Sequence, residues 1–427
     1  MSMHIALVGP IATADIGHLL DGETAHLPVG YYGAPLLVTL IAELLRRGHK
    51  VTVVTLSWNM ALDWRKPVHA FGHNLEMIYV PMRRRAWQPN GWRLGRIVDL
   101  YAFERRGLQY VIEQAAPDVV HAHWSYEFAW AAQQTGLPTL VTCHDSPFVV
   151  ARMYSRSRLT QSLYRWIRVG MAWYVLRRAP CVSAVSPYLQ AEVQALCKHP
   201  VTVVPNPLPP SLFDKPGQPD RHPDPHSPLL AMVANGWDRR KNPEPALRAF
   251  AALRIRKPGA RFSLYGSDFG PGERAEQWAR QHGMADGMEF IGRVPYSRLL
   301  GELAAADILV HPALEETFGM TLAEAMAMGI PVVGGASSGA VPWVVGEGGV
   351  LTDVTSATSI ELALLDLLDS PTRYRAAVFA AQARIRTHFT VDQVADAYEA
   401  IYCHLSGKMR HQERASVSVV ASLDNRG

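Results

Sequence analysis

The stretch ETFGMTLAEAMAMGIPVV occupies residues 316–333 and combines a turn, a helix and the entry to a strand. Residues 321–328 are rich in Leu, Ala, Met and Glu, which favour a helix. Gly329 is placed to cap that helix, and Pro331 prevents its continuation. Gly319 lets the backbone approach a ligand at the helix start. Because the free N–H groups there carry roughly +0.5 of an elementary charge, the stretch predicts a seat for phosphate.

Two glutamates bracket the start of this predicted helix. Glu316 precedes it and is placed to accept hydrogen bonds from sugar hydroxyls, and Glu324 is placed to bind a ribose diol. A hydrogen bond to a charged group contributes about 1.5–3 kcal/mol, so a few such contacts orient a sugar. The alternative is two solvated glutamates without a ligand. The glycine and the helix start favour binding.

Residues 316–333 resemble the signature of retaining glycosyltransferase family four, and the resemblance extends over residues 3–405. It implies the α/β GT-B fold, in which two Rossmann-like, doubly wound domains face a cleft and a C-terminal helix crosses back. It also implies that Glu316 contacts the donor sugar and that Glu324 binds the nucleotide ribose. The donor-binding set at the helix start is then Phe318, Gly319, Met320, Thr321 and Leu322.

The composition is that of a soluble globular protein, with 48% hydrophobic and 19% charged residues. No apolar run approaches the ~20 residues that span a bilayer, and the N-terminus predicts a buried strand instead of a signal peptide. We therefore expect a cytoplasmic enzyme. The four cysteines have neither metal-ligand nor redox spacing, which predicts reduced thiols. The net charge of +4 is too small to indicate nucleic acid binding.

Short apolar strands alternate with helical stretches, which is typical of βαβ units and a parallel sheet. Helices are expected at residues 32–47 and 109–115 in the first half. The strands predicted in the first half are 3–8, 50–56, 119–122, 139–143, 181–185 and 201–204. Those predicted in the second half are 229–233, 261–265, 289–291, 308–311 and 331–333.

A change in composition marks the domain boundary, because prolines and aspartates accumulate between residues 206 and 228. Val394, Tyr398 and Tyr402 form one stripe of a predicted terminal helix, which the resemblance implies returns to the first domain. The predicted organisation is an acceptor-binding domain (1–205), a linker (206–228), a donor-binding domain (229–388), the crossover helix (389–405) and a disordered tail (406–427).

A glycine turn and two histidines are the candidate site residues of the first half. Gly33 opens the helix predicted at 32–47, and the resemblance places it against the donor phosphate or the acceptor. His123 and His144 each follow a predicted strand and are expected to face the cleft. His144 resembles the family histidine near the donor phosphate and sugar, while His123 is assigned to the acceptor or the cleft. The alternatives are a glycine that the turn requires and histidines that are ordinary surface or core residues.

A basic loop, GWDRRKN at residues 236–242, follows the first strand of the second half. Fixed cations stabilise the negative charge that develops on a leaving diphosphate. The resemblance assigns this role to Lys241, but Trp237 stands where the family usually has an arginine. Arg239 or Arg240 then supplies the second cation; a solvated basic turn is the alternative.

Arg293 and Val294 follow another strand of the second half. Members of the family hold the nucleotide base there with backbone groups, so the resemblance adds both residues to the donor-binding set.

Residues 146–191 contain seven arginines and no acidic residue. Leu159, Leu163, Trp166, Gly170 and Trp173 fall on one helical stripe, with three arginines, Arg158, Arg165 and Arg168, predicted across from it. Such a helix is suited to an anionic membrane surface. The alternative is an ordinary core stripe with a solvated back.

The sequence as a whole predicts a retaining glycosyltransferase that moves a sugar from a nucleoside diphosphate donor to a hydroxyl of a glycan or lipid-linked acceptor. Glu316, His144 and Lys241 are the predicted catalytic residues. No cofactor or metal is expected, because cationic side chains hold the diphosphate. A sugar-nucleotide epimerase or phosphorylase of the same fold and a catalytically idle binding subunit are the alternatives.

Overall fold

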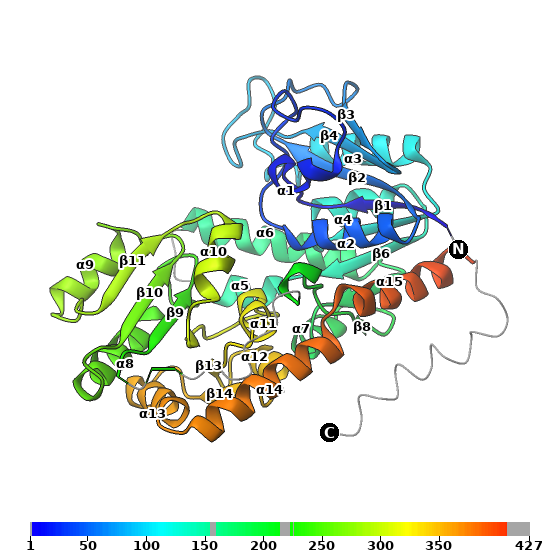
Figure 1. Ribbon diagram of the computed structural model, residues 1–427. Coiled ribbons are helices and arrows are strands. Elements are labelled where there is room, and N and C mark those ends of the chain that lie inside the picture. Colours follow the sequence, from blue (N-terminus) through cyan, green and yellow to red (C-terminus); the bar gives the residue numbers. More distant parts are fainter. Residues whose placement is uncertain (1, 154–158, 214–222, 225, 408–427) are drawn as a thin grey trace. The chain divides into compact units, whose positions relative to one another are not determined.

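The computed structural model describes residues 2–153, 159–213, 223–224 and 226–407. The chain forms two compact units, Met1–Pro207 with Val391 onward, and Leu208–Thr390 (Figure 1). Each unit is built on a largely parallel sheet, as the alternating pattern predicts. Parts of the predicted linker (214–222 and 225) and of the predicted tail (408–427) lie outside the described residues.

The sheet of the first unit has eight strands in the order β3-β4-β2-β1-β5-β6-β7-β8. Within the described residues every pairing is parallel except that of β3 with β4. The strand bounds are β1 His4–Val8, β2 Lys50–Ser57, β3 Val68–Gly72, β4 Leu75–Pro81, β5 Val119–His123, β6 Thr139–Cys143, β7 Cys181–Ala184 and β8 Thr202–Val203.

The predicted strands of the first unit are confirmed to within about two residues, but the hairpin β3–β4 was missed. Strand β3 is short, and His69 and Phe71 are exposed, so it lacks the apolar run of a buried strand. Asn74 closes the turn with a φ of 55°, a conformation that asparagine tolerates better than most residues.

Helices on both sides of this sheet bury their apolar faces against it. Leu37, Leu40, Ile41 and Leu44 pack with β1 and β2 in the main core of the unit. The helices are α1 Thr13–Ile16, η1 Gly17–Leu19, α2 Leu36–Arg46, α3 Ala102–Ala115, α4 Glu127–Gln134, α5 Pro147–Met153, α6 Leu159–Leu176, α7 Pro187–Gln194 and α15 Val391–Leu405.

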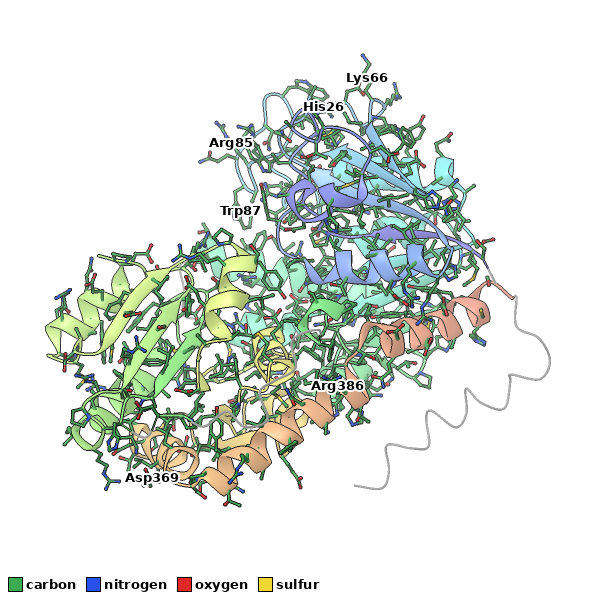
Figure 2. The ribbon with its side chains drawn as sticks, viewed as in Figure 1. His26, Lys66, Arg85, Trp87, Asp369 and Arg386 are labelled. Atoms are coloured by element: carbon green, nitrogen blue, oxygen red, sulfur yellow. The ribbon has the colours of Figure 1, made fainter. Side chains whose placement is uncertain are left out.

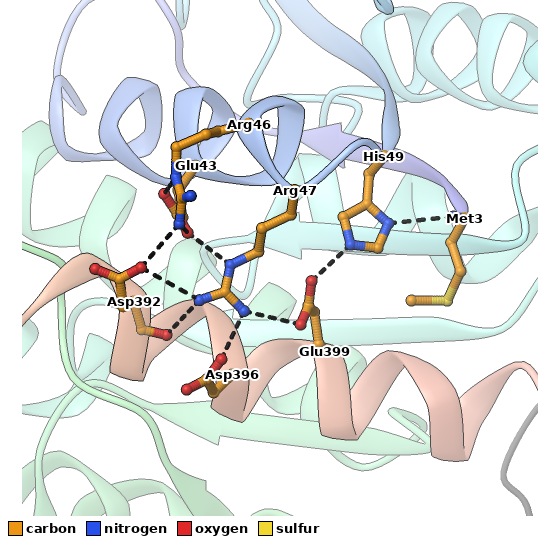
Figure 3. Close-up of polar contacts among 8 residues, drawn as sticks. All are labelled: Met3, Glu43, Arg46, Arg47, His49, Asp392, Asp396 and Glu399. Atoms are coloured by element: carbon orange, nitrogen blue, oxygen red, sulfur yellow. Dashed lines mark hydrogen bonds and ion pairs between the residues drawn. The ribbon is translucent and has the colours of Figure 1, made fainter. Parts of the chain in front are cut away.

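The terminal helix α15 packs beside α2 in the first unit (Figure 1). The predicted stripe of α15 is buried in the core, with Tyr402 fully enclosed. Arg47 at the end of α2 binds Asp396 at 2.6 Å and Glu399 at 2.9 Å (Figure 3). His49 Nε2 lies 2.6 Å from Glu399 Oε1. The helix is thus held by both apolar burial and ion pairs.

The second unit has six strands, all parallel within the described residues, in the order β11-β10-β9-β12-β13-β14. The strands are β9 Leu229–Val233, β10 Arg261–Tyr265, β11 Met288–Gly292, β12 Ile308–His311, β13 Val332–Gly335 and β14 Gly349–Thr352. The helices are η2 Pro210–Leu212, α8 Pro243–Arg256, α9 Arg274–Gln281, α10 Tyr296–Leu303, α11 Met320–Ala327, α12 Val341–Val345, α13 Ala357–Leu368 and α14 Pro371–His388.

Both sheets place loops at the carboxyl ends of their strands, where ligands bind in open α/β folds. In the first unit these loops follow β1, β2, β4, β5 and β6, and in the second they follow β9, β11 and β12. The predicted site residues lie in or beside these loops.

Candidate functional site

The N-terminus of α11 is the structural centre of the site in the second unit. The helix begins one residue earlier than predicted, at Met320, and Gly319 precedes it with a φ of 89°. This backbone conformation favours glycine, and a Cβ there would lie 2.6 Å from Leu322 Cδ1, so the leucine would have to shift. No side chain caps this end of the helix. The first N–H groups therefore remain directed at an incoming anion.

Glu316 and Lys241 form an ion pair just before this helix. Lys241 Nζ lies 2.5 Å from Glu316 Oε1, and His311 Nε2 at the end of β12 lies 3.5 Å from the same oxygen. Burial alone would raise the pKa of Glu316, but the His311 ring and the charges of Lys241 and Arg240 outweigh it and hold that pKa well below its usual range. Glu316 is a carboxylate at neutral pH.

The loop after β9 holds Lys241 in place by backbone and side-chain contacts. The Lys241 N–H donates to Asp238 Oδ1 at 2.9 Å. Asn242, in the left-handed region with a φ of 48°, donates to the carbonyls of Pro312 at 3.0 Å and Val354 at 2.9 Å. Because the loop is tied to segments after β12 and β14, the ammonium group is positioned before any ligand arrives.

The two arginines of this loop lie in different surroundings. Arg240 is partly buried, with Nη1 3.9 Å from Glu315 Oε2, whereas Arg239 is exposed. Trp237, at the position of the family arginine, is buried and packs against Phe269 and Trp278 with ring centroids 6.0 and 5.6 Å away. Its side chain therefore belongs to the core of the unit.

Glu324 lies in the second turn of α11 and is buried. Tyr296, at the start of α10, donates its hydroxyl hydrogen to Glu324 Oε1 at 2.7 Å. Burial raises the pKa of Glu324, and the tyrosine hydrogen bond partly offsets that effect. Arg293 and Val294 lie between β11 and α10; the arginine is exposed and the valine is half-buried. The structure thus brings the predicted ribose and base residues to one side of α11.

The side chains of the predicted donor set divide into core and surface. Phe318 is 2% exposed and packs against Phe389 with centroids 5.4 Å apart, and Leu322 is fully buried. Their side chains therefore belong to the core of the unit. Met320 and Thr321 are partly exposed at the helix start. The Ala340 N–H donates to the backbone carbonyl of Glu316 at 2.8 Å, which ties the loop after β13 to the backbone of Glu316.

The two predicted histidines of the first unit meet each other. His123 ends β5 and His144 follows β6, and His123 Nδ1 lies 2.9 Å from His144 Nε2. Burial lowers the pKa of His144 to about 3, although a hydrogen bond with Asn206 acts the other way. Burial also lowers the pKa of His123 far below its usual value. Both rings are neutral at physiological pH, so they serve as hydrogen-bonding groups.

A third histidine, His121, extends this cluster and was missed by the sequence analysis. Its Nδ1 lies 2.6 Å from the Tyr402 hydroxyl of α15, and its Nε2 lies 2.7 Å from Thr142 Oγ1. The rings of His121 and His123 are 4.0 Å apart. His123 Nε2 is buried and has no hydrogen-bond partner among the described residues. The signal available in the sequence was the motif HAH, in which His121 is a polar residue within the otherwise apolar predicted strand 119–122 and lies two positions before His123.

The glycine loop before α2 contains one glycine that packing requires and one that faces open space. A Cβ at Gly30 would lie 2.4 Å from the Ile11 carbonyl oxygen, so only glycine fits there. At Gly33 a Cβ would meet no atom within 4 Å, although the φ of 137° still favours glycine. Gly33 is therefore the one open to a ligand.

The predicted basic helix is α6, and the structure excludes one of the two interpretations of its apolar stripe. Leu159, Leu163, Trp166 and Trp173 are at least half exposed, so the core interpretation of this stripe is wrong. Arg168, predicted across from this stripe, lies on the inner side of the helix instead of on a solvated back. Its Nη1 forms an ion pair with Glu127 Oε2 at 2.5 Å, and its guanidinium lies over the Tyr126 ring. These two contacts hold the Arg168 side chain inward. Arg158 lies outside the described residues.

Within the described ranges, each helix is too short or too polar to cross a bilayer. The same residues contain no group of three His, Cys, Asp or Glu side chains arranged to hold a metal ion. Within the described residues the four cysteines are thiols that form no disulfide, as their spacing predicts.

Comparisons with known proteins match both halves of the chain. The family "Glycosyltransferase Family 4" matches residues 35–212, and "Glycosyl transferases group 1" matches residues 214–384. A D-inositol 3-phosphate glycosyltransferase of Corynebacterium diphtheriae is 33% identical over 42% of each chain. A GDP-mannose-dependent monoacylated alpha-(1-6)-phosphatidylinositol monomannoside mannosyltransferase of Corynebacterium glutamicum is 28% identical over 35% of this chain and 41% of the relative. The match thus spans about two fifths of the length of each of these relatives.

The fold matches that of a solved sucrose-phosphate synthase from Thermosynechococcus elongatus with a TM-score of 0.70. The two are 20% identical, and the match covers 95% of this chain and 100% of the other. The GT-B fold expected from the sequence is confirmed.

Proposed function

The chain belongs to the glycosyltransferases of group 1 and family 4, and we propose that it transfers a sugar, with retention of configuration, from a nucleoside diphosphate donor to a hydroxyl of a glycan or lipid-linked acceptor. The observation that carries this proposal is the Lys241–Glu316 pair, 2.5 Å apart, beside the uncapped start of α11. Named relatives support the substrate classes: one uses GDP-mannose and another acts on inositol 3-phosphate.

The reaction needs positive charge where the diphosphate leaves. Lys241 and Arg240 supply two cations, and the first N–H groups of α11 add the partial positive charge of a helix N-terminus. Before the donor binds, Glu316 neutralises Lys241. When the diphosphate takes over that role, the carboxylate is released to accept hydrogen bonds from the donor sugar.

Tyr296 occupies the position at Glu324 that a ribose diol would take. Its hydroxyl satisfies the buried carboxylate until the nucleotide arrives. A ribose that donates two hydrogen bonds replaces one hydrogen bond with two, so the exchange favours binding. The base then lies over Arg293 and Val294, between β11 and α10.

Neutral His144 contributes a hydrogen bond to the donor phosphate or sugar, and no proton transfer is required of it. In its neighbour His123, the buried Nε2 atom has no hydrogen-bond partner within the part of the chain that the structure describes. A buried polar atom without a partner costs about 1–3 kcal/mol. A substrate hydroxyl that reached this nitrogen would remove that cost, which supports a role for His123 in acceptor binding.

An anionic membrane surface is the proposed place of action. On α6, Trp166 and Trp173 are exposed, and the exposed Arg177, which follows the helix, lies over the Trp173 ring. Aromatic residues with basic neighbours favour the lipid interface. Liposome flotation tests this point. The change Trp166→Ser with Trp173→Ser should abolish binding to anionic vesicles, whereas Arg106→Gln, an exposed site on α3, should not. Unchanged flotation of the double variant would exclude α6 as the contact.

The assay for the main proposal is turnover of a panel of UDP- and GDP-sugars, first as slow donor hydrolysis and then with acceptors. Glu316→Gln should reduce hydrolysis of the active donor by a factor on the order of 100, since it removes the charge that orients the sugar. The matched control is Glu347→Gln, at an exposed residue of the same unit. Equal turnover in the two variants would contradict the role of Glu316, and donor binding without any turnover would support the idle binding subunit.

A further inference from the structure

A basic cavity of about 400 Å³ lies at the carboxyl ends of β2 and β4 in the first unit. This volume is in the range of small-molecule sites. The residues that line it include two arginines and no carboxylate: Trp58, Asn59, Met60, Leu62, Met82, Arg84, Arg85 and Asn90. Figure 2 shows Arg85 at the outer rim of these loops.

The triplet Arg83-Arg84-Arg85 divides into one structural and two solvent-facing arginines. Arg83 is 1% exposed and pairs with Asp99 at 2.8 Å and Glu104 at 2.6 Å, so its charge is neutralised. Arg84 and Arg85 are exposed, and neither forms an ion pair with an acidic residue of the described chain. Two uncompensated charges therefore stand side by side at the cavity.

The side chain of Arg84 and the backbone of Arg85 are held in place before any ligand binds. The Arg84 guanidinium stacks over Trp58 at 4.3 Å, and its Nε donates to the Trp58 carbonyl at 3.3 Å. The Arg85 backbone is clamped by Asn90, which accepts from its N–H at 2.9 Å and donates to its carbonyl at 3.1 Å. Pre-organised guanidinium groups lose less entropy when they bind an anion.

The cavity is connected to the glycine loop of the candidate site by hydrogen bonds. Asn59, one of its lining residues, accepts from Ser57 Oγ at 2.7 Å and from the Val29 N–H at 3.1 Å. Ser57 Oγ in turn accepts from the Gly30 N–H at 3.1 Å. A ligand in the cavity thus lies one hydrogen-bonded step from the loop that carries Gly33.

From these observations we infer that the cavity binds the phosphate of a phosphorylated polyol or sugar that serves as the acceptor. This inference rests on the proposed function and specifies its acceptor class. Adjacent arginines suit a phosphate because guanidinium groups bind its oxygens in pairs. The Trp58 ring supplies an apolar wall beside that charge.

Binding of inositol 1-phosphate and of inositol to the full-length protein, measured calorimetrically, tests the inference. The phosphate ester should bind at least tenfold more tightly than inositol. The double variant Arg84→Gln/Arg85→Gln should lose that difference, whereas the exposed control Arg106→Gln should keep it. All three arginines are exposed, so the variants should retain the wild-type melting temperature. Equal affinity of the double variant and the wild type for the phosphate ester would overturn the inference.

A second arm separates a soluble from a lipid-attached phosphate. If the cavity binds a lipid head group, vesicles of phosphatidylinositol should compete with inositol 1-phosphate for the protein. Vesicles of phosphatidylcholine should not compete. Competition by phosphatidylinositol assigns a lipid-attached acceptor; its absence, with inositol 1-phosphate still bound, assigns a soluble one. Donor hydrolysis without acceptor should be unchanged in the double variant. Absence of donor hydrolysis in the wild type would contradict the proposed function. The calorimetric measurement of phosphate binding does not depend on that result and would still test the inference.

Discussion

The polar cluster of the second unit is charged, whereas that of the first unit is neutral. Lys241 and Glu316 form an ion pair, and the pKa of Glu316 is held low by its neighbours. His123 and His144 are enclosed so fully that burial lowers their pKa values and leaves the rings uncharged. Burial disfavours the charged form of both kinds of group, but Glu316 has cations beside it that restore its charge, whereas no acidic residue contributes to the pKa shifts of His123 and His144. We therefore expect the charged residues of the second unit to act on the substrate through electrostatic interactions. The neutral histidines of the first unit should act through hydrogen bonds.

Removal of the lysine should have the largest effect. Lys241→Ala takes away the cation nearest to the leaving diphosphate, so kcat should fall by about 10²–10³. Steady-state kinetics with the active donor measures it, with Lys198→Ala, an exposed lysine of the first unit, as the control. A fall of less than about threefold would mean that the charged cluster does not stabilise the leaving group.

Neutralising the buried carboxylate of α11 should weaken the binding of the donor. In Glu324→Gln the ribose loses hydrogen bonds to a charged group, worth about 1.5–3 kcal/mol, so KM for the donor should rise by about 10- to 100-fold with a smaller change in kcat.

The paired variant Tyr296→Phe sharpens this test. It removes the hydroxyl that competes for Glu324, so its donor KM should equal or fall below that of the wild type. A rise in KM in Tyr296→Phe as large as in Glu324→Gln would show that the tyrosine itself binds the nucleotide.

Much of the fold follows from the sequence because its strands are buried apolar runs. Residues 229–233 and 261–265 were placed correctly for this reason. The hairpin β3–β4 was missed because buried and exposed residues alternate along its edge strand, β3, so the strand has no continuous apolar run. The helix start at Gly319 was read from a local signal, the glycine before a helix-forming run.

Parts of the site could not be read from local sequence. Tyr296 reaches Glu324 across 28 positions, and Tyr402 reaches His121 across 281. Only tertiary packing brings such pairs together. Trp237 likewise showed no local sign that its ring would join the core. The inward turn of Arg168 depends on Glu127, which lies on another helix.

Acid should destabilise the protein through the neutral histidines first. Because their folded pKa values are lowered, the unfolded state binds more protons below about pH 6.5, and stability falls as the pH decreases toward the folded pKa, which is about 3 for His144. Between pH 7 and 5 each such histidine costs about 2 kcal/mol. Urea unfolding at pH 7 and pH 5 measures this loss of unfolding free energy. In His121→Gln the loss should be about 2 kcal/mol smaller than in the wild type.

Glu316→Gln provides the contrast in the same experiment. The pKa of Glu316 is lowered, so its contribution to stability is present above the unfolded pKa of about 4.3 and is lost only below it. The unfolding free energy of Glu316→Gln should therefore change between pH 7 and pH 5 by the same amount as that of the wild type. A reduced difference in this variant, or an unreduced one in His121→Gln, would break the distinction between the two clusters.

The smallest effect is expected at the contact of α15 with the histidines. Tyr402→Phe removes the hydroxyl 2.6 Å from His121 Nδ1, which should cost about 1–2 kcal/mol of unfolding free energy. Donor KM should not change, because the hydroxyl supports the cluster without touching substrate. Chemical denaturation and donor kinetics of the same preparation check both statements; a changed donor KM at wild-type stability would contradict them.

The central claim is that a nucleoside diphosphate binds at the start of α11. A crystal structure with UDP or GDP, whichever raises the melting temperature more, tests it most directly. We predict the diphosphate against the N–H groups of Met320 and Thr321 with Lys241 beside it, and the ribose on Glu324 in place of the Tyr296 hydroxyl. Nucleotide density elsewhere, with the Tyr296–Glu324 hydrogen bond intact, would contradict the claim.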